Sequence, residues 1–178
     1  SLVTLTTDFG VGSPYVAAMK GVILSINPAA VIVDLTHGIP AQDIRQGALV
    51  LHEMARWFPP GTIHVAVIDP GVGTAREIIC ARIGEQLFLA PDNGLLSRLA
   101  LSTPPSTIVT VTRPEHWLPQ VSATFHGRDI LAPVAARLST AREQVADHLA
   151  IARGDQAVEG DATRLASSDA CDSGTSSV

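Results

Sequence analysis

The sequence predicts a three-layer α/β domain with a mostly parallel central sheet. Between residues 2 and 69, apolar β-branched runs alternate with segments of helical periodicity. The run "AVIVDL" at 30–35 shows no polar alternation, which is typical of strands buried on both faces of a parallel sheet. Three runs carry an aspartate at or near their end: Asp8, Asp34 and Asp69. Because ligands of open α/β sheets bind beyond the carboxyl ends of the strands, these acids mark the edge where a site is expected.

The first part of the chain is expected to contain three strands and two helices. Strands are predicted at residues 2–7, 30–35 and 63–69, each followed by a polar or Pro/Gly-containing loop. The first helix is expected from about Tyr15 to Ser25. The second is expected from about Asp43 to Trp57, because apolar residues recur there at helical spacing. Those residues are Ile44, Ala48, Leu51, Ala55 and Phe58.

The remaining elements complete a Rossmann-like domain. Residues 77–83 and 86–94 predict a hairpin-like pair of strands, with Gly84 in the connection. A short helix at 95–101, a strand at 107–112 and a helix entered at about Ile130 follow. From about residue 153 the sequence is small, polar and without periodicity. We therefore expect an N-terminal α/β domain at 1–152 and a low-complexity tail, disordered or aberrant, at 153–178.

The composition favours a small-molecule ligand. The 178-residue chain is 46% hydrophobic and 16% charged, with a net charge of −5. Such a low charged fraction suggests extensive burial, an oligomer or a missing partner domain. The negative charge and the lack of a Lys/Arg cluster argue against nucleic-acid binding. No apolar run reaches the roughly 18 residues of a membrane span, and no signal-peptide pattern begins the chain, so a cytoplasmic location is expected. Cys80 and Cys171 have no metal-ligand spacing and are expected to be unreactive thiols.

Common catalytic motifs are absent from the sequence. "GVG" occurs at 10–12 and 71–73, but neither copy extends to a phosphate-binding fingerprint. HExxH, GxSxG and CxxC are missing, which removes the commonest zinc, acyl-transfer and redox chemistries. A set of loop acids with an arginine and a histidine remains.

Each candidate residue has a structural alternative. Asp69 precedes Pro-Gly and is either a turn former or a partner of Arg76. Asp8 is either a ligand for a vicinal diol such as a ribose, or a helix cap or Asx-turn residue. His126 lies beside a glycine that permits close approach to a ligand, although a lone histidine is more often structural. Asn93 lies in a Pro-Asp-Asn-Gly turn, and the turn interpretation is favoured.

Several other residues are given structural interpretations. Arg128 and Asp129 are expected to cap or pair at the start of a helix. Trp57 and Phe58 are expected in the core. The five remaining histidines are assigned no function: His37, His52, His64, His116 and His148.

Four motifs together resemble the S-adenosyl-L-methionine hydroxide adenosyltransferase family, which is related to the fluorinating and chlorinating enzymes. They are "TLTTDFG" near the start, "DPGVGTAR" at 69–76, "APDNGLL" at 90–96 and "TFHGRDILAPVAA" at 124–136. The resemblance extends over residues 2 to about 150. It implies that 1–152 is a catalytic domain that hydrolyses S-adenosylmethionine to adenosine and L-methionine, by attack of a water-derived oxygen on the ribose C5′ carbon.

The resemblance also assigns residues. The family's Asp-Arg-His set falls on Asp69, Arg76 and His126. Its substrate-binding positions fall on Asp8, Phe9, Tyr15, Asn93, Thr124, Phe125 and Gly127, with Asp8 at the ribose. An arginine can hold a negative oxygen, and an acid and a histidine can accept and relay its proton. This scheme requires no metal or other cofactor.

Departures from the family pattern leave alternatives open. Family members are longer, with a second, β-rich domain carrying a Phe-Gly-Asn motif, and residues 151–178 show nothing like it. The resemblance implies a trimer in which one subunit's first domain and its neighbour's second domain form the site. The alternatives are therefore a silent adenosine-binding fragment, or metal-assisted hydrolysis through Asp8, Asp69 and His126. A halogenase is disfavoured, because those enzymes have tyrosine at Asp69 and a different pair at His126 and Gly127. Gln42 and Val72 likewise replace their tryptophan and threonine.

Overall fold

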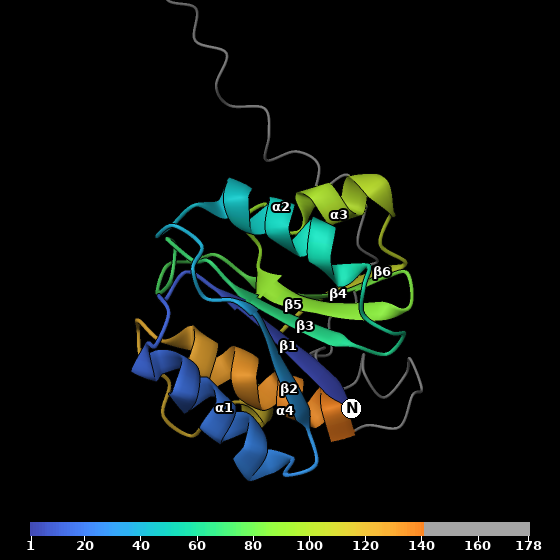
Figure 1. Cartoon of the computed structure of the whole chain (residues 1–178). Helices are drawn as coiled ribbons and strands as arrows, with labels where there is room; N and C mark the ends of the chain where they lie inside the picture. Colours follow the sequence, from blue (N-terminus) through green and yellow to red (C-terminus); the bar gives the residue numbers. More distant parts are fainter. Residues whose placement is uncertain (141–178) are drawn as a thin grey trace, which may run out of the picture.

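A six-stranded sheet forms the middle layer of the domain in the computed structural model, which describes residues 1–140 (Figure 1). Along the sheet the strands follow the order β2-β1-β3-β5-β4-β6, and β4 alone runs antiparallel to its neighbours. The predicted mostly parallel sheet is confirmed. The strands are β1 (Leu2–Thr7), β2 (Val31–Thr36), β3 (Ile63–Val67), β4 (Ile78–Ile83), β5 (Gln86–Pro91) and β6 (Thr107–Thr110).

Helices cover both faces of this sheet. Figure 1 shows α2 (Ile44–Ala55) and α3 (Ser97–Ser102) over one face, and α1 (Pro14–Ile26) and α4 (Ala132–Thr140) against the other. Two short elements precede α4: a 3₁₀ turn at Pro114–His116 and one turn of π-helix at Gly127–Leu131. The π-turn runs directly into α4, so the last helical segment begins earlier than the Ile130 predicted from the sequence.

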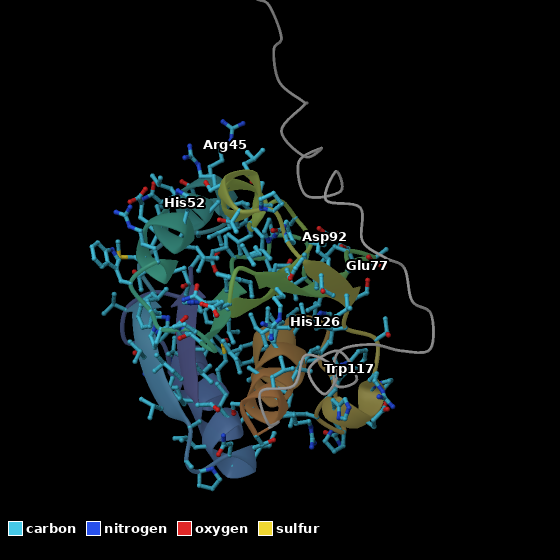
Figure 2. All side chains as sticks on the ribbon, turned by 90° about the vertical axis from the view of Figure 1, so that its right-hand side faces the viewer. Arg45, His52, Glu77, Asp92, Trp117 and His126 are labelled. Atoms are coloured by element: carbon cyan, nitrogen blue, oxygen red, sulfur yellow. The ribbon has the colours of Figure 1, made fainter. Side chains whose placement is uncertain are left out.

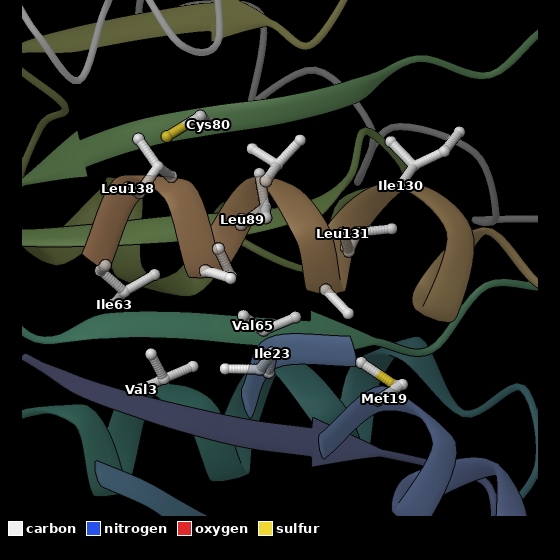
Figure 3. Close-up of a cluster of buried hydrophobic side chains, with 14 of the residues drawn as sticks. Val3, Met19, Ile23, Ile63, Val65, Cys80, Leu89, Ile130, Leu131 and Leu138 are labelled. Carbon is white, nitrogen blue, oxygen red and sulfur yellow. The ribbon is translucent and has the colours of Figure 1, made fainter. Parts of the chain in front are cut away.

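The prediction that the strand at 30–35 is buried on both faces is wrong, because β2 lies at the edge of the sheet and none of its residues is fully buried. The central strand β3 has that burial instead. Every residue of β3 is buried, because successive side chains point to opposite faces and both faces are covered. Val65 joins the apolar cluster under α1 and α4, which Figure 3 shows with Met19, Ile23 and Leu131. The next residue, Ala66, joins the cluster under α2 and α3. Fully burying one such Val, Ile or Leu side chain contributes roughly 1.5–3 kcal/mol.

The helix starts follow local capping chemistry. The Ser13 hydroxyl accepts the Tyr15 N–H, and Pro14 occupies the first turn of α1. Asp43 caps α2 by accepting the Gln46 N–H at 2.8 Å. Asp8 therefore caps no helix, and that interpretation is wrong.

One core prediction is also wrong. Trp57 is 73% exposed, because it follows the end of α2 and its ring lies 5.2 Å from the Arg56 guanidinium instead of reaching the core. Phe58 is half-buried, and its ring lies edge-on to the His64 ring. Cys80 is buried, and burial raises the pKa of its thiol to about 12, in agreement with an unreactive thiol. Cys171, His148 and the predicted tail at 153–178 lie outside the described residues.

The connections place a crevice at one edge of the sheet. The chain leaves β1 through α1 to reach β2 on one side, and leaves β2 through α2 to reach β3 on the other. The strand order therefore reverses between β1 and β3, where open α/β sheets bind ligands beyond the carboxyl ends. Asp8 directly follows β1, and Asp69 lies two residues after β3.

Candidate active site

A tight loop after β3 brings Arg76 back beside Asp69. The Val72 N–H donates to the Asp69 carbonyl at 3.2 Å, and the Thr74 N–H donates to the Gly71 carbonyl at 3.0 Å. A β-carbon on Gly71 would lie 3.3 Å from Cγ of Arg76, so glycine leaves the room that the returning side chain needs. The sequence posed a turn and a site as alternatives at this position, and the loop contains both the turn and the contact between the two side chains.

The Asp69–Arg76 contact is a forked, charge-assisted pair. Arg76 Nε donates to the two carboxylate oxygens at 2.9 and 3.1 Å, and Nη2 also contacts Oδ2. The Asp69 side chain is only 5% exposed, and the Arg76 side chain only 11%. Such forks are stronger and more directional than single ion pairs. The pair is therefore held in one geometry at the ligand-binding edge of the sheet.

The same guanidinium reaches His126, 50 residues further along the chain. Arg76 Nη2 lies 2.8 Å from Nδ1 of His126. Arginine has only donors, so Nδ1 must be the acceptor, and the neutral ring carries its proton on Nε2. Burial, followed by the charge of Arg76, lowers the pKa of His126 below 6.5, so the ring is neutral at pH 7. Figure 2 shows His126 between the sheet and the start of the orange helix.

A close backbone contact joins the Asp69 loop to the His126 loop. Gly73 adopts a φ of +80°, and a β-carbon there would lie 2.5 Å from the carbonyl oxygen of Ala123. Only glycine permits this approach. The His126 loop is also closed on itself, because Asp129 accepts the Ser122 N–H at 2.8 Å and the Ser122 hydroxyl accepts the Phe125 N–H at 3.0 Å.

Asp8 holds a neighbouring loop rather than a helix. Its Oδ2 accepts the Gln42 N–H at 2.7 Å. Gln42 has a φ of 65°, and it is the one non-glycine residue with positive φ among residues 1–140. The other carboxylate oxygen has no hydrogen bond within the described part of the chain. Asp8 therefore retains an oxygen that can accept from a ligand.

Three aromatic rings lie beside these groups. Phe9, Tyr15 and Phe125 pack edge to face, with centroids 5.0–6.2 Å apart. Tyr15 is 58% exposed, so the cluster presents an apolar surface to solvent. Gly127 is buried, and a β-carbon on it would lie 3.5 Å from Cζ of Phe9. Thr124 is exposed in the same loop as Phe125.

Asn93 is occupied by the protein itself. Its Nδ2 donates to the Ile68 carbonyl at 2.9 Å, and its Oδ1 accepts the Leu95 N–H at 3.2 Å. These bonds agree with the favoured turn interpretation and anchor the turn to the end of β3. A contact between Asn93 and substrate stays a prediction.

The structure adds residues that the sequence analysis left without a role. His37 directly follows β2, and its two ring nitrogens lie close to the Thr7 hydroxyl and the Asp34 carboxylate. Nothing in the local sequence signals this group, because its members come from different elements of the fold. Arg128 and Asp129 pair as expected, with Nε and Oδ1 2.6 Å apart.

Residues 1–140 contain neither a membrane-spanning helix nor a cluster of metal-ligating side chains. No helix in this range has the length and apolarity required to cross a bilayer. Within the same residues, no group of three or more His, Cys, Asp or Glu side chains is arranged to hold a metal ion.

The fold and the site together define a class of protein. It is a doubly wound α/β domain with an Asp-Arg-His set beside the point between β1 and β3 where the strand order reverses. Within this class, residues 3–147 match the family described as the SAM hydroxide adenosyltransferase N-terminal domain. The chain belongs to this family. It is 45% identical over 138 residues to the (R)-S-adenosyl-L-methionine hydrolase of Salinispora arenicola, covering 77% of this chain and 52% of that protein. The Thermus thermophilus protein of the same name is 41% identical and covers 75% and 54%.

More distant relatives and solved structures agree with this assignment. A fluorinase of Nocardia brasiliensis is 27% identical over 161 residues, covering 78% of this chain and 54% of that protein. The crystal structure of an uncharacterized conserved protein from Thermotoga maritima superposes with a TM-score of 0.75 at 41% identity, covering 78% of this chain and 54% of the other. The chain thus spans about half the length of the curated relatives it matches.

Proposed function

We propose that this domain hydrolyses S-adenosyl-L-methionine to adenosine and L-methionine, with Asp69, Arg76 and His126 at the reacting centre. Two observations support the proposal: relatives at 41–45% identity are named (R)-S-adenosyl-L-methionine hydrolase, and Arg76 joins Asp69 and His126 in one hydrogen-bonded set. The second observation carries the mechanism, because it restricts what each group can do.

The reaction is a displacement at carbon with a good leaving group. The water oxygen forms a bond to C5′ while the C5′–S bond breaks, and the electron pair returns to sulfur to give the neutral thioether of methionine. No general acid is needed for this departure. Water is a weak nucleophile, with a pKa of about 15.7, so the site must orient it and take its proton.

We assign the proton to Asp69. Nδ1 of His126 is occupied by a donor of Arg76, and Nε2 of the neutral ring already carries a hydrogen. Each oxygen of Asp69 has two acceptor positions, and among the described residues Oδ1 accepts only the Arg76 Nε–H. The attacking oxygen becomes strongly acidic as its bond to carbon forms, so even an arginine-paired carboxylate is basic enough. In this scheme the Nε2–H of His126 orients the water.

The remaining residues would bind the substrate. The oxygen of Asp8 that has no hydrogen bond within residues 1–140 suits a ribose hydroxyl, and Phe9, Tyr15 and Phe125 offer an apolar wall for the adenosine. Thr124, Gly127 and Asn93 would complete the contacts. No cofactor takes part in this scheme. Val11 and Tyr15, 89% and 58% exposed, suit a surface covered by the second domain of a neighbouring subunit in a trimer.

The test is direct. The purified chain is incubated with S-adenosyl-L-methionine, and adenosine and methionine are quantified by chromatography beside His126→Ala. We expect equimolar products above the level of that variant. Adenosine formation no faster than in the variant would contradict turnover. Calorimetry on the same samples then separates a domain that binds without reacting from one that does not bind.

A further inference from the structure

Strand β1 carries two threonine–histidine pairs of the same chemistry. Thr4 Oγ1 lies 2.7 Å from Nδ1 of His64, and Thr7 Oγ1 lies 2.9 Å from Nδ1 of His37. Both threonines are fully buried within the sheet. The two pairs differ in what lies beyond the histidine, and that difference assigns them different roles.

The Thr4–His64 pair lies inside the core. His64 is fully buried, stacks on Phe88 with ring centroids 4.7 Å apart and lies edge-on to Phe58. Burial lowers the pKa of His64 to about 4, so this ring is neutral at pH 7. Phe58 precedes β3 and Phe88 lies inside β5, so these ring contacts are away from the carboxyl edge of the sheet.

The Thr7–His37 pair, in contrast, lies beside charged side chains at that edge. Nε2 of His37 lies 3.1 Å from Oδ1 of Asp34, close enough for ion-pair attraction but outside hydrogen-bond alignment. Asp34 Oδ2 accepts from Lys20 Nζ at 2.6 Å. Burial opposes the ionisation of Asp34, but Lys20 and His37 outweigh it and lower its pKa, so the carboxylate stays charged.

These contacts orient the hydrogen bonds. Because the Asp34 carboxylate has only acceptors, the His37 Nε2 that faces it carries a hydrogen. The Thr7 hydroxyl is hydrogen-bonded to Nδ1 of the same ring at 2.9 Å, and its oxygen accepts the Phe9 N–H at 3.3 Å. The carbonyl of His37 accepts the Gly10 N–H at 2.9 Å. His37 therefore holds residues 9 and 10 through both its ring and its backbone.

Asp8 lies between these two anchored amides and the loop after β2. Its carboxylate accepts the Gln42 N–H, so the segments 7–10 and 37–42 are bonded to each other at three points. We propose that the Thr7–His37–Asp34 chain is a positioning device that fixes the 8–10 loop, and with it Asp8 and Phe9, for substrate binding. This inference rests on the proposed function, since it assigns those residues to the substrate.

Two isosteric variants test it. Thr7→Val removes the hydroxyl that joins His37 to the Phe9 N–H, while Thr4→Val removes the equivalent hydroxyl at His64. Both keep the β-branched shape that a strand favours. Affinity for S-adenosyl-L-methionine is measured by calorimetry, thermal stability by melting temperature, and the exchange of the Phe9 and Gly10 amide hydrogens by NMR.

We expect Thr7→Val to raise the dissociation constant and to speed the exchange of the Phe9 amide, each by roughly fivefold or more, as for loss of one hydrogen bond. Thr4→Val should lower the melting temperature while leaving both quantities within twofold of wild type. Thr7→Ser, which keeps the hydroxyl, should restore affinity and protection.

Three results overturn the positioning role. They are unchanged exchange in Thr7→Val, faster exchange without loss of affinity, and equal losses of affinity in Thr7→Val and Thr4→Val. If the wild-type chain binds no S-adenosyl-L-methionine, the proposed function fails, and the role in substrate binding fails with it. The exchange comparison still decides separately whether the chain fixes the loop.

Discussion

Two aspartate–arginine pairs lie near His126, and they differ in what else the arginine side chain contacts. Asp69 and Arg76 are seven positions apart, and the arginine also contacts the histidine ring. Asp129 and Arg128 are sequence neighbours, and the guanidinium lies 4.8 Å from the centroid of the Phe125 ring. The first pair orients a titratable group, whereas the second supports an aromatic wall.

Burial of the carboxylates differs as well. Asp129 is fully buried and also accepts the Ser122 N–H, so it holds the backbone of the His126 loop. Within residues 1–140 the Asp69 carboxylate accepts from no backbone N–H and keeps acceptor positions unused. Two pairs of identical composition can thus serve reaction and architecture, and their remaining hydrogen-bonding capacity distinguishes them.

The largest expected effect separates the pairs by activity. Arg76→Met removes the group that holds both Asp69 and His126, and should lower kcat roughly 10²–10³-fold, as for loss of a donor at a reacting centre. Arg128→Met, the matched control, should lower kcat less than fivefold, since it loses only contacts to Asp129 and Phe125. Initial rates of adenosine release measure both. Comparable losses in the two variants would remove the distinction.

The next effect separates the pairs by stability. Asp129→Ala should reduce the free energy of unfolding by about 2–4 kcal/mol, because it leaves the Ser122 N–H unpaired and removes a buried carboxylate. Urea denaturation followed by circular dichroism measures the loss.

The carboxylate of Asp129 also predicts a pH dependence. Burial raises its pKa, but hydrogen bonds from Arg128 and Ser122 outweigh burial and set it below 3.8. Its stabilisation should therefore be complete above pH 3.8 and disappear as the pH falls through the lowered value. Asp129→Ala should unfold with a weaker acid dependence than wild type, and parallel pH profiles for the two proteins would count against this role.

The smallest expected effect is on the titration of His126. Burial and the charge of Arg76 lower its pKa, so the folded state binds its proton less readily than the unfolded state. The linked stability is lost as the pH falls from 6.5 through the lowered pKa. Arg76→Met should raise the pKa of His126, while Arg128→Met should shift it less, as followed by NMR of the ring protons. A lower pKa in Arg76→Met would contradict the electrostatic coupling.

The sequence predicted the architecture well because burial determines it. Apolar runs located the strands, and helical spacing located α2. The run at 30–35 was wrongly expected to be buried, because the sequence does not show that β2 lies at the edge of the sheet. Trp57 was misplaced because the apolar pattern continues past Ala55, where the helix ends. The π-turn at 127–131 has no periodicity signal of its own.

The site was predictable only in part. The local sequence left a turn and a contact between Asp69 and Arg76 as alternatives, and resemblance to a known family favoured the contact. His126 is 50 residues away, and resemblance to a known family, not spacing, placed it beside Arg76. The group around His37 was missed, because its contacts depend on the pairing of β1 with β2.

Gly73 offers a way to interpret other sequences. A β-carbon at this position would collide with the Ala123 carbonyl, so the two loops could not approach as they do here. Another chain could retain aspartate, arginine and histidine at the positions of Asp69, Arg76 and His126 but have a larger residue at position 73. Its motif would match this one, but its three side chains would not be brought together as they are here. Such sequences are natural tests of whether matching residues are enough to transfer a function between relatives.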